Sequence, residues 1–447
     1  MKPLKTIGLV SLGCAKNAVD LQVMTGHLLK KGFSLAPNPD AADVVLVNTC
    51  AFIEEAREEA AAEILRALEL KAAGQVRAVV VAGCFAQRYG SAILDSFPGV
   101  DAVLGIDALD KIAGVIEKIG AKPVVKIPRG EPRKVFNPPV PALRLTGAAF
   151  AYLKIAEGCA HRCSYCAIPA IRGKYRSRTV KAILAEARAL IASGVKELNV
   201  IAQDPMLYGV DLPPEKGVRP DLVQLLKAID ALKGDFRVRV LYSYPSEITD
   251  GFLDWLNTSP HAIRYVDVPL QHTVPAILKA MGRGSAVQAS LEAAARIRAA
   301  VPGVTLRTTI MTGFPGETER DFKRLLSDIA RFSFDHLGAF AFSPEEGTVA
   351  AEMGGRVAAG TGERRRDEVM RAQRRVWLPR AKARLGKTFP ALVVAPGVAR
   401  LESQAPDVDG VTRLKSVRGV PPPAVGTWIS VRLTALRGYD FEGVPVS

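Results

Sequence analysis

The chain has 447 residues, which allows two or three domains, and 48% of them are hydrophobic, enough to build a packed core. It carries 60 Lys and Arg against 45 Asp and Glu, a formal net charge of +15, and a basic surface suits a partner rich in RNA. The chain has no run of eighteen apolar residues, which argues against a transmembrane helix, and its six cysteines in cluster-like spacings argue against secretion, so a cytoplasmic protein is expected.

Three segments near the start of the chain share one layout, an apolar strand followed at once by a cysteine. The strands are predicted at 7–13, 43–49 and 77–83. The cysteines that follow them are Cys14, Cys50 and Cys84. With a helix predicted over 54–74, these strands form a βαβ domain with a parallel sheet over residues 4–120. The carboxyl ends of parallel strands meet at one edge, so the cysteines are expected to converge, and separate packing inside the strands is the alternative.

The next segment, 121–146, is rich in proline and is interpreted as a linker to a second domain over 147–376. In that domain predicted strands and helices alternate. The strands are predicted at 150–158, 197–203, 236–245, 265–271, 305–313 and 336–343. The helices are predicted at 182–194, 222–232, 275–281, 287–300 and 319–332. About six β/α units result, fewer than the eight of a closed barrel, which predicts an α/β fold with a partial (β/α)6 barrel.

The most distinctive motif follows the first strand of this domain. Cys159, Cys163 and Cys166 form a C-x3-C-x2-C pattern in the string EGCAHRCSYC. Three closely spaced thiolates can hold one iron–sulfur cluster, and because such clusters usually take four, one iron is left free to bind a reactant. The alternatives are a zinc site with His161 as fourth ligand, a redox disulfide that leaves the third cysteine unused, and simple packing of buried cysteines.

Two further segments of the second domain have both a structural and a functional interpretation. GFPGETERDF (313–322) forms a tight strand-to-helix turn in which Glu317 or Thr318 caps the helix. IRGKYRSR (171–178) places four basic residues just past the cysteine loop, where they either face a substrate or belong to a charged surface loop.

The last part of the chain is the most basic. Sixteen basic and eight acidic residues follow position 360 and give this part a net charge of +8. ERRRDEVMRAQRR (363–375) is predicted to be a basic helix, which either faces RNA or is a solvated connection between two domains. Short strands such as 388–395 and 427–436 then alternate with Gly/Pro turns, the pattern of a small β-barrel over 378–446.

The C-x3-C-x2-C motif resembles the signature of the radical S-adenosylmethionine (SAM) superfamily. The resemblance implies that Cys159, Cys163 and Cys166 hold a 4Fe–4S cluster whose open iron chelates SAM, and that an electron from the cluster cleaves SAM to a 5′-deoxyadenosyl radical. Tyr165 occupies the aromatic position that lies near the adenine in the superfamily. Gly313 stands at the glycine-rich strand end that packs against the adenosyl part. A partial (β/α)6 barrel is also what the superfamily implies.

Essentially the whole chain resembles the methylthiotransferase family of radical SAM enzymes. SLGCAKNAVDLQVM, VNTCAFIEEAREE and AGCFAQRY match the N-terminal motifs of the family. The tail resembles the TRAM domain, an OB-like module with which the family holds its macromolecular substrate. The resemblance implies that Cys14, Cys50 and Cys84 bind a second 4Fe–4S cluster that handles sulfur, and that one SAM supplies the radical and another the methyl group.

Within this family, three passages resemble the RimO type, which modifies an aspartate of protein twelve of the small ribosomal subunit. They are Leu270-Gln271-His272, LYSYPSEI (241–248) and the tail segments around Asp407 and Tyr439. Pro205-Met206 departs from the family pattern, which usually has threonine, and no hydrogen-bonding role is carried over there.

The resemblance as a whole implies a transferase that adds a methylthio group to the β-carbon of an aspartate in a small-subunit ribosomal protein, with RNA nearby. A monomer that receives electrons from a separate donor is expected. The alternatives are a transfer-RNA adenosine methylthiotransferase and a non-catalytic iron–sulfur protein that binds RNA.

Overall fold

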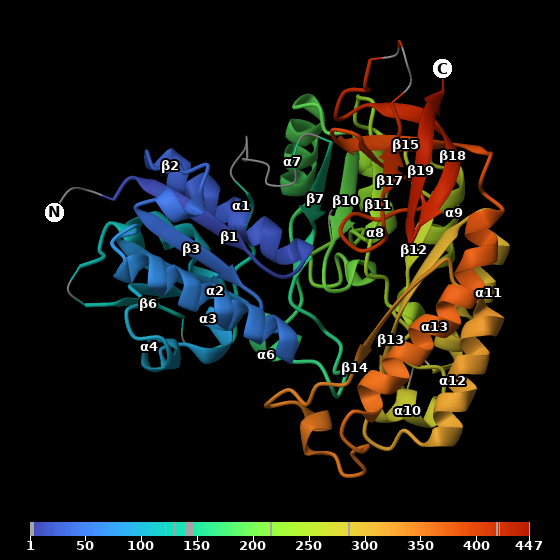
Figure 1. Cartoon of the computed structure of the whole chain (residues 1–447), viewed down its shortest axis with the longest axis horizontal. Coiled ribbons are helices and arrows are strands. Elements are labelled where there is room, and N and C mark those ends of the chain that lie inside the picture. Colours follow the sequence, from blue (N-terminus) through green and yellow to red (C-terminus); the bar gives the residue numbers. More distant parts are fainter. Residues whose placement is uncertain are drawn as a thin grey trace.

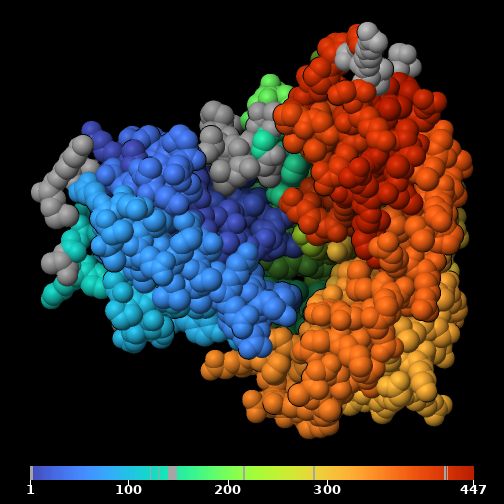
Figure 2. All heavy atoms as spheres, viewed as in Figure 1, coloured from blue at the N-terminus to red at the C-terminus, as the bar shows by residue number. Residues whose placement is uncertain are grey.

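The structure is a computed structural model that describes residues 4–120, 122–128, 130–138, 147, 149–214, 217–284, 287–416, 419 and 421–446. The last eight residues of the predicted linker, 139–146, lie outside the described residues, as do positions 121 and 129. The N-terminal sheet, the central strands and helices, and the C-terminal barrel follow one another along the chain and pack side by side (Figures 1 and 2). Within the described ranges, no helix is long and apolar enough to cross a membrane.

The N-terminal part is a six-stranded sheet with every neighbouring pair parallel, in the order β2-β1-β3-β4-β5-β6. The strands are β1 (Thr6–Ser11), β2 (Ser34–Leu35), β3 (Val44–Thr49), β4 (Ala78–Gly83), β5 (Ala102–Leu104) and β6 (Val124–Lys126). The helices are α1 (Ala15–Lys30), α2 (Glu54–Ala72), α3 (Cys84–Tyr89), α4 (Ala92–Ser96) and α5 (Ile112–Ile116). Val45 and Val47 face one hydrophobic cluster, and Val44 and Leu46 face another on the opposite side. The sheet is therefore buried on both faces, as its apolar strands predict.

The central part is built around two parallel sheets of three strands each, β11-β10-β7 and β12-β13-β14. The strands are β7 (Phe150–Lys154), β10 (Glu197–Ile201), β11 (Arg237–Val240), β12 (Tyr265–Asp267), β13 (Thr305–Thr312) and β14 (His336–Ala341). The helices are α7 (Val180–Ala192), α8 (Leu222–Asp230), α9 (Asp250–Thr258), α10 (Pro275–Ala280), α11 (Val287–Ala300), α12 (Glu319–Phe332) and α13 (Thr361–Lys382). The two sheets are joined by backbone hydrogen bonds, such as the one that Ser243 N donates to Asp267 O at 2.8 Å. The six strands and their helices are the predicted partial barrel.

The basic helix α13 is the last helix of this barrel rather than a solvated connection. Its buried residues recur every three or four positions and pack against β14 and α12. Near its end, Trp377 also enters the hydrophobic core of the C-terminal domain. The helix therefore runs without interruption across the expected border at 376–378 and joins both domains.

The C-terminal domain is a closed five-stranded barrel in the order β15-β16-β17-β19-β18. The strands are β15 (Thr388–Ala395), β16 (Val398–Leu401), β17 (Thr412–Leu414), β18 (Trp428–Arg437) and β19 (Asp440–Val446). The barrel is anchored to the central sheets by buried polar contacts. Arg400 pairs with Glu197 of β10 at 2.8 Å, and Asp409 accepts a hydrogen bond from the Tyr265 hydroxyl of β12. The predicted fold class, a parallel N-terminal sheet, a partial barrel and a small β-barrel, is confirmed.

Candidate active site

The three N-terminal cysteines lie at the carboxyl ends of neighbouring strands. Cys14 stands between β1 and α1, Cys50 follows β3, and Cys84 follows β4 as the first residue of α3. Because β1, β3 and β4 are adjacent in the sheet, the three thiols meet at one edge. Gly13 allows this approach, since its φ is +88° and a Cβ there would lie 2.8 Å from the Cβ of Cys50.

The C-x3-C-x2-C motif lies in a loop that follows β7. A short antiparallel ladder of β8 (Ala156–Glu157) and β9 (Arg176–Ser177) closes the loop, and α6 (Ile168–Arg172) lies within it. Inside the loop, Cys159 N donates to Gly173 O, just after α6, at 3.2 Å, and Cys166 N donates to Cys163 O at 3.1 Å. These backbone hydrogen bonds fix the conformation of the loop and do not involve the cysteine thiols.

All six cysteines line one cavity of about 440 Å³ between the N-terminal sheet and the central barrel. Its basic lining side chains, apart from His161, are Lys16, Arg172 and Arg283. Among the described residues, no Asp or Glu lines it. The two sets of three thiols therefore face a common space whose charged lining residues are basic.

A buried ion network joins the two sets of cysteines. Lys154 of β7 pairs with Asp20 of α1 at 2.5 Å and with Glu157 at 2.8 Å. Arg172 of α6 pairs with the same two carboxylates at 2.9 and 2.8 Å, and all four side chains are almost fully buried. Arg172 also donates to the sulfur of Cys84 at 3.2 Å. Two cations and two carboxylates thus balance each other where the barrel contacts the N-terminal sheet.

The segment 171–178 is therefore not a charged surface loop along its whole length. Arg172 and Arg178 are both buried, and Arg178 pairs with Glu186 at 2.6 Å. That part of the expectation is wrong because Arg172 turns inward between the two domains and Arg178 turns toward α7. The carboxylates that receive these cations are Asp20, Glu157 and Glu186. Asp20 and Glu157 lie within the cysteine motifs, but nothing in those motifs predicted a charge-pairing role for them.

Burial raises the pKa of the thiols in the cavity, to about 12 for Cys84 and Cys166 and to about 11 for Cys159. For Cys84, Arg172 partly opposes this effect. Burial by itself would raise the pKa of Glu157 as well, but Arg172 and Lys154 outweigh it and lower that pKa. Free thiolates are disfavoured here, so binding of a metal group that takes thiolate ligands would release protons.

His161 has protein partners and is not oriented as a zinc ligand. Its Nε2 lies 2.6 Å from Asp204 Oδ2, and its ring stacks on Tyr244 with centroids 3.7 Å apart. The other Asp204 oxygen accepts Met206 N at 3.0 Å and caps the short 3-10 turn η3 (Pro205–Leu207). Within the described chain, no three His, Cys, Asp or Glu side chains converge on a single-ion site. Structural zinc takes four closed ligands, and the expected fourth ligand, His161, is already engaged by Asp204.

The structure separates the two residues expected near SAM. Tyr165 lines the cavity, and burial raises its pKa. Gly313 does not line it: its N–H donates to Glu317 at 2.6 Å, and a Cβ there would lie 2.7 Å from the Cα of Gly362 in α13. His272 of the expected Leu-Gln-His motif is fully buried, and its Nδ1 accepts a backbone N–H just before α10. His272 therefore supports the chain beside the cavity.

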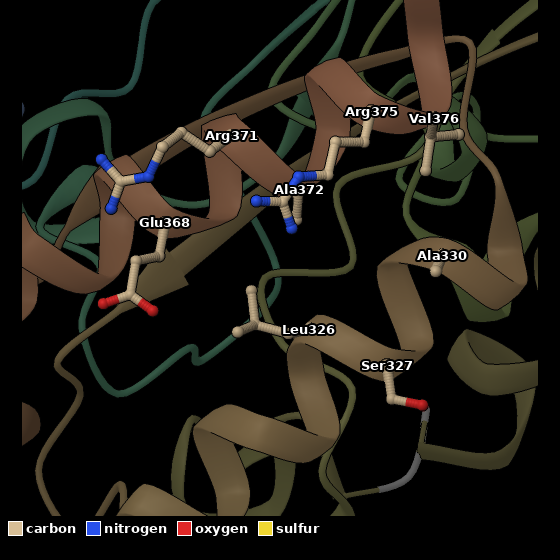
Figure 3. A pocket seen from close by; sticks show the side chains of 8 residues that line it. All are labelled: Leu326, Ser327, Ala330, Glu368, Arg371, Ala372, Arg375 and Val376. Atoms are coloured by element: carbon tan, nitrogen blue, oxygen red, sulfur yellow. The ribbon is translucent and has the colours of Figure 1, made fainter. Parts of the chain in front are cut away.

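A second hollow lies away from the cysteines, between α12 and α13, with a volume of about 700 Å³. It is lined by Leu326, Ser327, Ala330, Glu368, Arg371, Ala372, Arg375 and Val376 (Figure 3). In Figure 3 Leu326 points from α12 toward α13, and the guanidinium groups of Arg371 and Arg375 lie along α13. This groove is a basic surface feature and not part of the cavity that holds the thiols.

A partial (β/α)6 barrel with a three-thiol loop after its first strand defines the class of radical SAM enzymes. Sequence comparison agrees, since the Radical SAM superfamily model matches residues 153–329. The model of the uncharacterized protein family UPF0004 matches residues 6–105, and that of the TRAM domain matches residues 386–446. The 4Fe–4S cluster and SAM that this superfamily uses suit the cavity, because its lining supplies thiols and cations.

Curated relatives extend over nearly the whole chain. The ribosomal protein uS12 methylthiotransferase RimO of Opitutus terrae is 40% identical over 98% of this chain and 96% of its own length. The protein of the same name from Geobacter sulfurreducens is 39% identical over 99% and 98%. The chain therefore belongs to the RimO family of radical SAM methylthiotransferases and is a transferase.

Solved structures are more distant and show the fold alone. The radical SAM methyltransferase TsrM of Kitasatospora setae, with cobalamin and a 4Fe–4S cluster, is 17% identical over 94% of this chain and 83% of its own, with a TM-score of 0.56. The cobalamin-dependent radical SAM enzyme OxsB matches 83% of this chain and 56% of its own at 13% identity and a TM-score of 0.52. Both likenesses extend beyond the barrel.

Proposed function

We propose that this protein adds a methylthio group to the β-carbon of an aspartate in ribosomal protein uS12, using two 4Fe–4S clusters and two SAM molecules. The observation that carries the proposal is the single cavity lined by two separate sets of three cysteines. The named activity of the relatives supplies the substrate. The division into residues 4–120, the linker 121–146, the barrel 147–376 and the TRAM-like domain 378–446 belongs to the same proposal.

In this proposal Cys159, Cys163 and Cys166 hold the cluster that binds SAM, and the set on β1, β3 and β4 holds the second cluster. When bound, these groups supply hydrogen abstraction at an unactivated carbon and a source of sulfur. Tyr165 is assigned to the SAM site, and so is Gly313, which directly follows β13 but does not itself line the cavity. The protein itself positions the groups and excludes water.

Ion pairs between the two domains fix the position of one set of cysteines relative to the other. Lys154 and Arg172 of the barrel hold Asp20 of the N-terminal domain, so the two sets of thiols cannot shift independently. A further bridge forms where Arg88 of α3 pairs with Glu345 at 2.7 Å, and Arg57 of α2 pairs with the same carboxylate. Fixed separation of two reacting centres is the main contribution that a protein scaffold makes to such chemistry.

The partner is proposed to be uS12, presented in the cytoplasm with ribosomal RNA nearby to a monomer that receives electrons from a separate donor. Exposed cations without an ion pair among the described residues support an RNA-facing surface on α13 and the barrel. Five of them are Arg371, Arg375, Lys382, Lys387 and Arg432. Replacing all five by Ala should weaken binding to the ribosomal subunit and reduce its salt dependence. Lys30→Ala, Lys31→Ala and Lys118→Ala on the N-terminal domain form the control.

The deciding assay offers the reconstituted enzyme both uS12 and transfer RNA, with SAM and a reductant. A mass increase of about 46 Da on a uS12 aspartate, from replacing H by SCH3, is the expected result. The same increase on adenosine, with uS12 unchanged, would overturn the substrate assignment. Failure to cleave SAM at all would favour a non-catalytic iron–sulfur protein.

The two-cluster assignment has its own test. The full chain should bind about eight irons after reconstitution, and about four after all three cysteines of either set are changed to Ala. The variant that lacks Cys14, Cys50 and Cys84 should still form 5′-deoxyadenosine but no methylthio product. Circular dichroism controls for folding, and loss of all iron from one triple variant would contradict two independent sites.

A further inference from the structure

Lys16 is a buried cation in the cavity without a carboxylate partner of its own. It follows Cys14 by two residues, in the first turn of α1, and is 8% exposed. A helix N-terminus is the positive end of its dipole, which makes it an unfavourable place for an ammonium group. Burial adds a desolvation cost, so the position requires compensation from nearby groups.

The groups around Lys16 supply only part of that compensation. The ammonium nitrogen lies 3.0 Å from the ring centroid of Tyr242, a cation–π contact that offsets some of the lost hydration. Cys14, Asp267 and Glu157 are within electrostatic range, in that order of effect. Cys14 belongs to the set proposed to hold a cluster, Asp267 pairs with Arg307, and Glu157 belongs to the network described above. No salt bridge of Lys16 itself occurs in the described part of the chain.

A second, independent feature marks the same cavity as a site for a polar ligand. Gln271 is more than nine-tenths buried and lines the cavity, and its Oε1 has no hydrogen-bond partner. Its backbone is fixed to β13, because Gln271 N donates to Thr309 O at 2.8 Å. Gln271 and Tyr242 also have positive φ values of 71° and 73°, a strained conformation for residues with side chains. Two strained residues beside an amide oxygen without a partner and an ammonium group without a salt bridge indicate a preformed site.

We propose that Lys16 receives the carboxylate of the substrate aspartate, while Gln271 Oε1 accepts a hydrogen bond from a backbone N–H of the same peptide. This inference rests on the proposed function, because it takes an aspartate as the substrate. An ammonium group next to Cys14 would hold the carboxylate on the side of the cavity where the N-terminal cysteines lie. Lys16 is thus a specificity-determining residue that selects an acidic side chain over its neutral analogue.

The test compares two peptides of uS12 that differ only in whether the target residue is Asp or Asn. Their affinities for the reconstituted enzyme with SAM, without reductant, are measured by fluorescence anisotropy. Wild type should bind the Asp peptide more tightly, and Lys16→Met should weaken binding of the Asp peptide roughly 10- to 100-fold while changing the Asn peptide little. Lys16→Arg should restore part of the preference, and Lys30→Met, at the exposed end of α1, is the matched control.

Several outcomes would overturn the inference. Equal loss of affinity for both peptides would mean that Lys16 balances the charge of the neighbouring metal group, and weaker SAM binding in Lys16→Met would assign Lys16 to the SAM carboxylate. If Lys16→Met does not fold, the wild-type comparison still decides, because equal binding of both peptides contradicts a carboxylate site. If wild type binds and modifies neither peptide, the proposed function itself has failed.

Discussion

Replacing Arg172 should destabilise the contact between the N-terminal sheet and the barrel more than any surface change. Arg172→Met removes one of two cations that balance Asp20 and Glu157, and it leaves a net negative charge in a region that is at most 4% exposed. Breaking a buried ion pair from one side typically costs about 3–5 kcal/mol, because the remaining charge has neither water nor a partner. The free energy of unfolding should fall by roughly that amount.

Urea unfolding followed by circular dichroism measures this loss. Arg364→Met is the matched control, since Arg364 pairs with Glu368 at a similar 2.8 Å but is 53% exposed. An exposed i,i+4 pair of this kind contributes about 0.3–0.5 kcal/mol. Adding Glu157→Gln to Arg172→Met restores charge balance and should recover part of the stability. If Arg172→Met matches the control, or Glu157→Gln brings no recovery, the charge-balance argument is refuted.

Three further outcomes follow from the local geometry. Gly158→Ala should lower the free energy of unfolding by about 1–3 kcal/mol because its φ is +75°, and by more because the new Cβ would lie 2.1 Å from a backbone oxygen. Gly194→Ala, at φ +91°, has the same backbone strain but open space around the new Cβ. Thermal unfolding should therefore show a larger loss for Gly158→Ala than for Gly194→Ala. Tyr265→Phe removes the hydroxyl that donates to Asp409 and should lower the unfolding free energy by about 1–3 kcal/mol. Burial alone would raise the pKa of Asp43, but hydrogen bonds from two backbone N–H groups and an arginine lower it to about 2. Its stabilising effect is therefore present above pH 4 and lost as the pH falls toward 2, so unfolding curves of Asp43→Asn and wild type should converge in acid.

The C-terminal barrel is joined to the central sheets too closely for deletion to isolate its role. Glu197 is held between Arg400 of the barrel and Arg239 of β11, at 2.8 and 2.9 Å. Removing the C-terminal barrel would take Arg400 away from Glu197, so Glu197 and Arg239 would stay buried with only some of their partners. Loss of activity after deletion would therefore report misfolding as well as lost substrate binding, which is why the surface substitutions on α13 and the barrel are the better test.

Local signals in the sequence predicted the helices and strands of the central barrel well. The capping residue of α12 is Thr318, whose hydroxyl accepts Asp321 N at 3.2 Å, and Glu317 instead accepts the backbone N–H of Gly313. Such features depend on residues three or four positions apart, so they can be read along the chain. The short strands β5 and β6 and helix α9 were not predicted. β5 and β6 have only three residues each, too few for a periodic pattern.

The sequence by itself predicted the chemistry of the site, because the two cysteine patterns and the strands that precede them are properties of the chain. Three strands that each end in a cysteine bring their thiols to one edge wherever the sheet lies. Only the tertiary structure decided how the two sets face each other. Lys154 and Arg172 pair with Asp20, which lies 134 and 152 positions away in the sequence. Because all three side chains are buried, these ion pairs fix the two domains relative to each other. Packing of the central domain against the N-terminal sheet also places Lys16 beside the ring of Tyr242 and gives it no salt bridge with a described residue. The partners of a side chain depend on what folds against it and not on its neighbours in sequence.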